Sequence, residues 1–241
     1  MKFFWDTPET VADGVGFSHF DVTHLGWLAV FAIIAVLGSV GYGKLSCAGR
    51  RGLRKGVAAA MLIMEALKLV FLLVSERFMW DYLPLHLCGI NIFLIAVHAW
   101  KPSKLLDNFL YLVCIPGALA ALLFPNWTAL PLGNAFHIHS FIVHILLVLY
   151  PLMLALNGQL SLDIKEVPKT LGILAAMAIP IYGLNLLLNT NFMFLMWASV
   201  GNPLYWFGQK WGSHLFGFPV IIAAVVLVMY LPVVLLKKRK N

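Results

Sequence analysis

The segment YLPLHLCGIN, residues 82–91, places a histidine and a cysteine two positions apart in an apolar run. Pro84 suits the first turn of a helix, so His86 and Cys88 are expected within about two turns of a helix start. Asn91 follows Cys88 by three positions and shares its helical face, whereas His86 points elsewhere but can border the same cavity. A thiol near a helix N-terminus and an imidazole is placed to act as a nucleophilic thiolate. Inert packing explains the same spacing, because cysteine is readily buried.

A second set of candidate residues lies in FHIHSFIVH, residues 136–144. His137 and His144 are seven positions apart and share one stripe of a helix, while His139 points to the far side. A histidine in a membrane helix usually faces the bundle interior and is functional by default. Interhelical hydrogen bonding is the structural alternative. For this group we favour function.

Few charged residues fall inside the apolar segments. Glu65 and Lys68 lie three positions apart near the middle of VAAAMLIMEALKLVFLLV. An unpaired charge at that depth costs several kcal/mol, so we expect a structural ion pair; a proton or ion path is the alternative. Asn185 is a candidate partner for this pair across the bundle. Asp107 and Asn108 mark the start of an apolar segment, where a helix cap or an interfacial group is expected.

The elements that position these residues follow from composition. Of the 241 residues, 61% are hydrophobic and 11% charged, against roughly 25% charged in a soluble domain. A bilayer core of about 30 Å needs roughly 20 apolar residues per helix. We therefore predict an all-α polytopic membrane protein, a bundle of seven transmembrane helices. They are expected near residues 24–45, 57–75, 84–100, 105–124, 138–157, 168–189 and 214–236.

The basic residues indicate the orientation of the bundle. Most of the 17 Lys and Arg residues lie between the first two segments, after the third and fifth, and in the terminal KKRK. By the positive-inside rule these regions are cytoplasmic and the N-terminus is outside. Residues 1–23 are then an extracytoplasmic segment, residues 24–236 the transmembrane domain and residues 237–241 a basic cytoplasmic tail. Every histidine except His98 falls in the outer half, where we expect the chemistry.

Residues 189–212, called the outer loop below, form an unusual connection. The segment is too apolar for a solvated loop, and Asn, Gly and Pro interrupt it too often for a span. Tryptophan and tyrosine prefer the headgroup level of a membrane. The outer loop is therefore expected to be an interfacial or re-entrant lid, with a simple aromatic belt as the alternative.

Several classes of function are disfavoured by the sequence. The net charge of +7 does not indicate nucleic-acid binding, because the basic residues fall between apolar segments and form no stripe. Cys47, Cys88 and Cys114 form no CxxC pair, so no thiolate zinc site is indicated. No HxxxH or HxxH pair supplies a helical metal site. We expect no metal and no cofactor.

Four stretches together carry a family resemblance: PLHLCGINIFL, IPGALAALLFPNWT, FHIHSFIVHILLVLYPLML and NTNFMFLM. They resemble the YwaF-type family of bacterial integral membrane proteins, which is grouped with the vertebrate transmembrane protein 164 acyltransferases. The resemblance covers residues 20–236. The vertebrate relatives move a fatty acyl group between phospholipids with a membrane cysteine and histidine. Matched by motif, the cysteine is Cys88 and the histidine, from FHIHS, is His139.

The resemblance implies a lipid acyltransferase or acyl hydrolase. A histidine would take the Cys88 proton, the thiolate would attack a lipid ester, and the acyl group would pass to a lysolipid or water. Asn91 is the candidate oxyanion donor, and His86 completes the catalytic candidates. The chain departs from the glycerolipid acyltransferases, since no His is followed four residues later by Asp. Residues expected to contact substrate are His137, His144, Asn185, Phe192 and Trp197.

The expected partners are membrane phospholipids or fatty acyl chains, in a bacterial cytoplasmic membrane. Two other functions remain open on the sequence: a non-catalytic seven-helix receptor or a small-molecule or lipid binder, and a transporter. The oligomeric state is left open as well.

Overall fold

A computed structural model describes the backbone of residues 2–238 and the side chains up to residue 235, so residues 239–241 of the predicted basic tail lie outside the described residues. Within this range every regular element is helical and no strand forms. Seven helical segments are long and apolar enough to cross a membrane. The predicted all-α class, with seven helices of spanning length, is confirmed.

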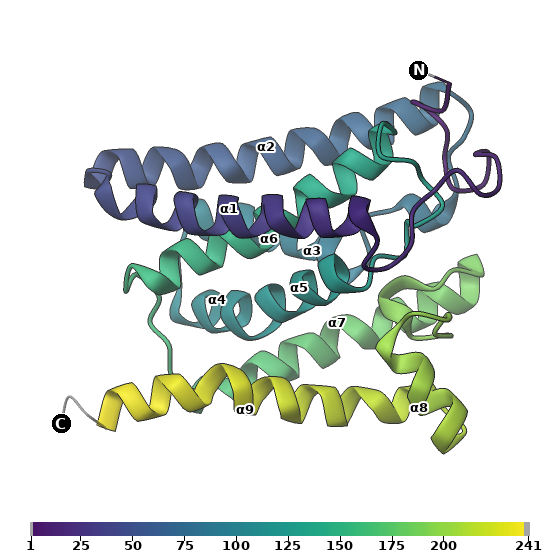
Figure 1. Cartoon of the computed structure of the whole chain (residues 1–241). Coiled ribbons are helices and arrows are strands. Elements are labelled where there is room, and N and C mark those ends of the chain that lie inside the picture. The colour runs from purple at the N-terminus through teal and green to yellow at the C-terminus, as the bar shows by residue number, and fades with distance from the viewer. Residues whose placement is uncertain (1, 239–241) are drawn as a thin grey trace.

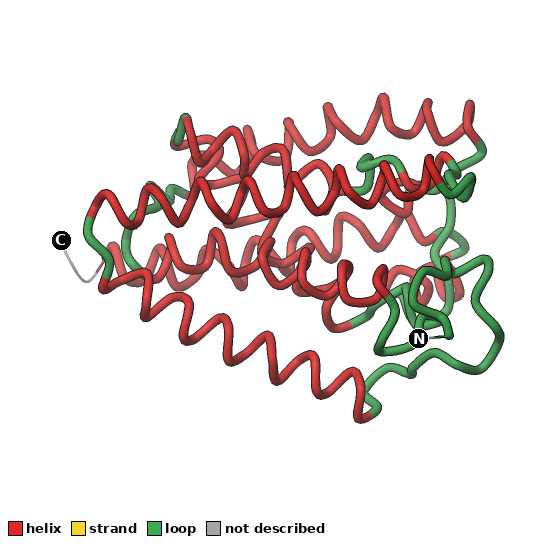
Figure 2. The backbone as a smooth tube through the Cα atoms, turned by 90° about the horizontal axis from the view of Figure 1, so that it is seen from above, coloured by secondary structure: helices red, strands yellow, loops and turns green. Residues whose placement is uncertain are grey.

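The spanning helices run back and forth between two ends of the molecule (Figure 1). Residues 2–21 and the outer loop gather at the end marked N in Figure 2, which is called the N-terminal end below. The helices are α1 (Val22–Lys44), α2 (Cys47–Val74), α3 (Leu87–Trp100), α4 (Lys104–Phe109), α5 (Ile115–Leu123), α6 (Ala135–Leu156), α7 (Val167–Leu188), α8 (Pro203–Trp211) and α9 (Gly217–Lys238). Short single turns are η1 (Trp80–Tyr82), η2 (Leu110–Cys114), η3 (Ile164–Glu166), η4 (Phe192–Phe194) and η5 (His214–Phe216).

Helix α2 begins well before its apolar stretch. Ser46 caps it by accepting a hydrogen bond from Gly49 N, and the helix runs on through the basic stretch before Val57. Arginine, lysine and alanine are good helix formers, so the helix continues beyond the apolar window. The expected span near residues 57–75 agrees with the apolar part of α2, but the helix itself begins earlier, at Cys47.

The fourth span combines three elements: α4, the π-helical turn η2 and α5. Pro116 lies in the first turn of α5, directly after the π turn. Because proline has no N–H, the regular hydrogen-bond ladder is interrupted at this point, and a π turn accommodates the interruption. The span remains continuous from Lys104 to Leu123.

Helix α6 is the centre of the bundle and packs against α1, α2, α3 and α5. In the spanning windows of α6 and of α4–α5, 56% of residues are buried, against 11% for α7 and 6% for α9. The core therefore lies around α6, while α7 and α9 form a peripheral layer at the bottom of Figure 1. Large buried core side chains include Tyr42, Met61, Ile95, Phe141 and Tyr150.

Two hydrogen bonds join α9 to the fourth span. The Tyr230 hydroxyl donates to Asn108 Oδ1 at 2.6 Å, and the Tyr111 hydroxyl donates to Met229 O at 2.8 Å. The rings of Tyr111 and Tyr230 meet edge to face at 5.8 Å. These tyrosines fix α9 to the bundle through polar contacts.

The segment before α1 covers the N-terminal end of the bundle. Ala135 N donates to Phe4 O at 2.8 Å, and the Asn134 side chain donates to Phe3 O and Asp6 O, each at 2.7 Å. Asn134 Oδ1 also caps α6 by accepting from two backbone N–H groups of its first turn. One buried amide thus connects the N-terminal segment to the central helix.

Candidate functional site

Cys88 lies in the first turn of α3, directly after the N-cap residue His86 and Leu87. Ile90 N donates to His86 O at 3.0 Å, which begins the helical ladder. The N–H groups of Leu87, Cys88 and Gly89 have no hydrogen-bond acceptor among residues 2–238. A free thiol therefore lies beside three unsatisfied backbone donors.

Gly89 holds this helix start against the preceding turn. A Cβ at position 89 would lie 2.7 Å from Pro84 Cα and 2.7 Å from Pro84 O. The backbone of Pro84 therefore packs directly on the α3 helix, an approach that only glycine permits. This contact fixes the direction of the first turn that carries Cys88.

Asn91 lies one turn further along α3 and is fully buried, with 0% exposure. Neither its amide oxygen nor its amide nitrogen has a hydrogen-bond partner in the described part of the chain. A buried unsatisfied polar group costs about 1–3 kcal/mol, so such a group calls for a functional explanation. Helical side chains lean toward the N-terminus, which directs this amide toward the turn of Cys88.

Charged and titratable side chains meet where α2 packs against α3 and α6. Lys68 Nζ lies 2.5 Å from Glu65 Oε1 in α2. On α6, His139 Nε2 lies 3.7 Å from Glu65 Oε2, and this buried nitrogen has no hydrogen-bond partner among the described residues. His139 therefore keeps one nitrogen available next to a carboxylate.

His86, His139 and His144, each partly buried, form the histidine cluster. All three lie within electrostatic reach of Lys68, and His144 is within reach of both other imidazoles. His144 Nδ1 lies 2.7 Å from Ser140 O and its ring stacks on Trp127 at 5.0 Å. The cluster thus combines residues from α6 and from the N-cap of α3, all of which feel the charge of Lys68 in α2.

Cys88 makes no hydrogen bond to an imidazole anywhere in residues 2–238. The sulfur is within electrostatic reach of Cys114. The Cys88 side chain is partly buried and packs against the main hydrophobic core. The arrangement thus brings a nucleophile candidate and base candidates to one end of the bundle without a hydrogen bond between them.

Two of the expected substrate contacts bond to other parts of the protein. His137 Nε2 accepts from Trp27 Nε1 at 2.8 Å, and its Nδ1 donates to Leu130 O at 3.0 Å. Asn185 donates to Phe192 O at 3.0 Å and accepts from Phe192 N at 2.8 Å. These side chains fasten α1 to α6 and the outer loop to α7.

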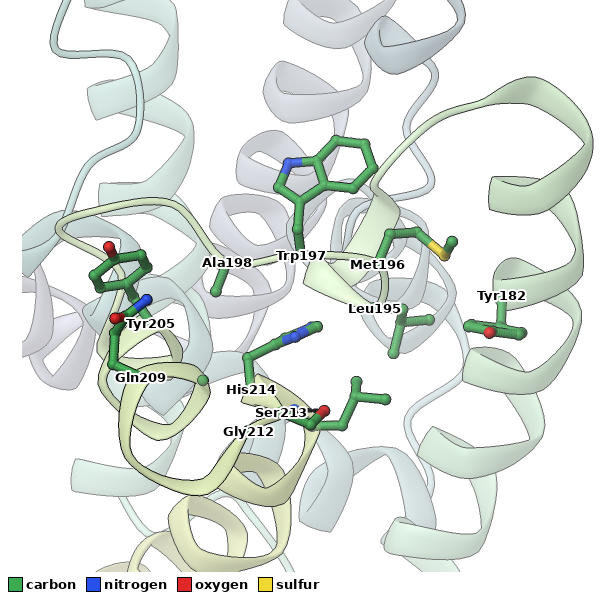
Figure 3. Close-up of a pocket in the computed structure, with 12 residues that line it drawn as sticks. Tyr182, Leu195, Met196, Trp197, Ala198, Tyr205, Gln209, Gly212, Ser213 and His214 are labelled. Carbon is green, nitrogen blue, oxygen red and sulfur yellow. Dashed lines mark hydrogen bonds between the residues drawn. The ribbon is translucent and has the colours of Figure 1, made fainter.

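The outer loop bends sharply over His86. Phe192 is fully buried, and its ring meets that of His86 at 5.3 Å. Met193 and Phe194 adopt φ of 58° and 55°, a left-handed conformation that residues other than glycine seldom adopt. Met193 N donates to His86 Nδ1 at 3.3 Å. Trp197 lies beyond this bend, is half exposed and lines a cavity (Figure 3).

The profile of one protein family matches residues 15–230, nearly the whole chain. The chain belongs to the TMEM164 family. No curated protein and no solved structure matches it. The match spans both the α3 start and the histidine cluster, so the site lies within the part of the chain that the TMEM164 family shares.

In this TMEM164-family protein a second buried network lies at the opposite end. His98 Nε2 lies 2.8 Å from Asp107 Oδ1, and His98 Nδ1 lies 2.9 Å from the Tyr150 hydroxyl. Asp107 Oδ2 also accepts from Ser161 N at 2.9 Å. Asp107 was expected to be a cap or an interfacial group, and its partners come from α3, α6 and the loop before α7. No periodicity in the sequence connects Asp107 with these partners.

Among the described residues, no group of three or more His, Cys, Asp or Glu side chains is arranged to hold a metal ion. The histidine cluster contributes imidazoles, and the charge of Lys68 beside it is balanced by the ion pair with Glu65. Its chemistry fits proton transfer and the binding of a polar substrate group.

Proposed function

We propose that this TMEM164-family protein is a membrane-embedded lipid acyltransferase or acyl hydrolase with Cys88 as its nucleophile. The observation that carries the proposal is the start of α3, where a free thiol lies beside unsatisfied N–H groups and above the unpartnered Asn91. Donors directed at a developing oxyanion are the largest single contribution to many acyl transfers.

In the proposed reaction a histidine removes the thiol proton, and the sulfur attacks the ester carbonyl of a phospholipid. The N–H groups of Cys88 and Gly89 and the amide of Asn91 stabilise the oxyanion. The ester C–O bond then breaks, the lysolipid alkoxide takes the proton from the histidine, and a thioester remains. A second lysolipid or water attacks the thioester and regenerates the thiol.

His139 is the base that we favour, because its Nε2 has no hydrogen-bond partner among the described residues and Glu65 nearby can stabilise the imidazolium. His86 Nδ1 already accepts from Met193 N. Proton transfer from Cys88 to His139 proceeds through a bridging water or a closer approach of α3 to α6, since catalytic contacts often tighten only with substrate.

By the positive-inside rule we propose that the N-terminal end of the bundle faces outside, so that the first helical turns would lie near the ester groups of the outer leaflet. We also propose that the protein lies in a bacterial cytoplasmic membrane and that its relatives are of the YwaF type. The outer loop would then cover the acyl chain of the substrate.

The test replaces Cys88 with alanine and measures acyl exchange between a labelled phospholipid and a lysolipid in vesicles that contain the purified protein. Turnover should fall by at least about a thousandfold, because the covalent route is removed. Mass spectrometry should find a hydroxylamine-sensitive acyl group on Cys88 of the unaltered protein.

Cys47 supplies a matched control, because it also lies in the first turn of a helix and is exposed. Cys47→Ala should exchange lipid at the normal rate. Undiminished exchange by Cys88→Ala would refute the thiol mechanism. No turnover in the unaltered protein, with lipid binding retained, would favour a non-catalytic binder, which the cavity beside Trp197 also suits.

A further inference from the structure

A cavity of about 450 Å³ lies at the N-terminal end, between α7, the outer loop, α8 and η5 (Figure 3). This cavity is called the outer cavity. Its lining contains no Asp or Glu. The polar side chains of the lining are Tyr182, Tyr205, Gln209, Ser213 and His214.

These polar groups can act as hydrogen-bond donors to a ligand. The hydroxyls of Tyr182 and Tyr205 and the Gln209 amide have no hydrogen-bond partner in residues 2–238. Ser213 Oγ accepts from Leu215 N, which leaves its hydroxyl proton free to donate. Hydroxyl and amide donors in a lining without carboxylates suit an anion with several oxygen acceptors, such as a phosphodiester.

His214 connects the wall of the cavity to the outer loop. Its Nε2 lies 2.9 Å from Phe194 O, and its Nδ1 has no partner in the described part of the chain. Lys210, in the last turn of α8, adds positive charge to the same region.

The surroundings of the outer cavity match the headgroup level of a membrane. Trp197, Trp206 and Trp211 are about half exposed, at 51%, 53% and 50%, and tryptophan prefers this level. The remaining lining includes Leu195 and Met196, which lie on the side of α7 in Figure 3. Polar donors beside an apolar wall suit a molecule with a charged head and hydrocarbon chains.

One bend of the chain connects the outer cavity with the start of α3. Phe194 O contacts His214 in the cavity wall, and the adjacent Met193 donates its N–H to His86, two residues before Cys88. Both loop residues adopt left-handed φ. The cavity and the proposed nucleophile are therefore joined through two consecutive residues of the outer loop.

We propose that the outer cavity binds the phosphodiester headgroup of a glycerophospholipid, with the ester region directed past Phe192–Phe194 toward Cys88. The direction toward Cys88 rests on the acyl transfer proposed above. The headgroup site itself rests on the donors, the tryptophans and the lack of acidic lining.

The test changes the charge of the cavity at Gln209, an exposed residue of α8 with no protein partner among those described. Binding of a water-soluble short-chain phosphatidylglycerol to the full chain in detergent is measured by calorimetry. Gln209→Glu should raise Kd at least about tenfold, because like charges in a binding site oppose each other. Gln209→Lys should bind at least as tightly as the unaltered protein.

Three further ligands define the chemistry. A diacylglycerol of the same chain length should bind equally to both Gln209 variants. Competition by glycerophosphoglycerol but not by inorganic phosphate identifies a lipid headgroup site, whereas equal competition by inorganic phosphate would overturn that assignment. Equal Kd values for Gln209→Glu, Gln209→Lys and the unaltered protein would also overturn it.

The failure of this proposal is distinguishable from the failure of acyl transfer. Cys88→Ala should bind the short-chain lipid normally and lose turnover. A protein without turnover whose lipid affinity still depends on the charge at position 209 would retain the headgroup site and lose the thiol mechanism.

Discussion

At the scale of single residues, the site combines buried polar atoms that lack partners with a paired charge. Asn91 and His139 Nε2 are unsatisfied among the described residues, while Glu65 and Lys68 form an ion pair in the same region. Pairing Glu65 with Lys68 avoids two isolated charges inside the membrane. The other carboxylate oxygen of Glu65 still faces His139. Structural and catalytic roles can therefore coexist at Glu65.

Replacement of Glu65 by leucine should leave the partly buried Lys68 without a counter-charge. Breaking a buried pair from one side costs about 3–5 kcal/mol, so the midpoint of thermal unfolding in detergent should fall sharply. The double variant Glu65→Leu, Lys68→Leu should regain most of the lost stability, since no charge remains buried.

The double variant also separates the two roles of Glu65. A stable double variant with slowed lipid exchange supports stabilisation of His139 by the carboxylate. If the double variant loses as much stability as Glu65→Leu alone, the ion pair is not what stabilises this region.

At the scale of elements, the start of α3 depends on close packing of its first turn. Gly89→Ala would place a methyl group 2.7 Å from the Pro84 backbone. The turn must shift, at a cost of about 1–3 kcal/mol for overpacking. We expect a lower unfolding temperature and slower lipid exchange, because the backbone donors beside Cys88 move with the turn.

Gly117 in α5 is the matched control for this change. A Cβ there would meet Leu87 Cδ2 at 3.6 Å, an ordinary contact with the same turn of α3. Gly117→Ala should be neutral or stabilising by about 0.5–1 kcal/mol, as expected for a helix interior. Equal losses from both substitutions would indicate that the Pro84 contact has no special role.

The apolar windows were sufficient to predict the seven spans, because length and hydropathy alone decide whether a helix can cross a bilayer. They could not predict that α2 begins at Cys47, since capping and helix propensity extend a helix beyond its apolar part. The π turn before Pro116 was also missed, because a change in hydrogen-bond register leaves no trace in hydropathy.

The candidate site was predictable only in part. Helical spacing placed Cys88 and Asn91 on one face of α3, and topology placed the histidines of α6 at the same end. The bonds of His137 to Trp27 and of Asn185 to Phe192 join distant elements. Such partners depend on how the helices pack, which a single sequence does not specify.

At the scale of the whole molecule, residues 2–21 and the outer loop close the N-terminal end of the bundle. Asn134 connects this cover to α6 through donors to Phe3 and Asp6 and through acceptance from the first turn of the helix. The cover and the central helix should therefore respond together when this amide changes.

Asn134→Asp keeps the capping oxygen but loses the two donors to the N-terminal segment. We expect faster hydrogen exchange at residues 3–6 and little change in α6, measured by mass spectrometry. Asn134→Ala loses both sets of bonds and should destabilise the protein by about 1–3 kcal/mol. Unchanged exchange in the aspartate variant would contradict the proposed connection.

The two tyrosine bonds of α9 have a mechanical consequence. In a bilayer, apolar contact alone gives little drive for helices to associate, and only 6% of the α9 spanning window is buried. The hydrogen bonds from Tyr230 to Asn108 and from Tyr111 to Met229 therefore hold this helix against the fourth span. A force applied at the C-terminus would separate α9 first. The bundle around α6, which carries Cys88 and the histidines, would stay folded.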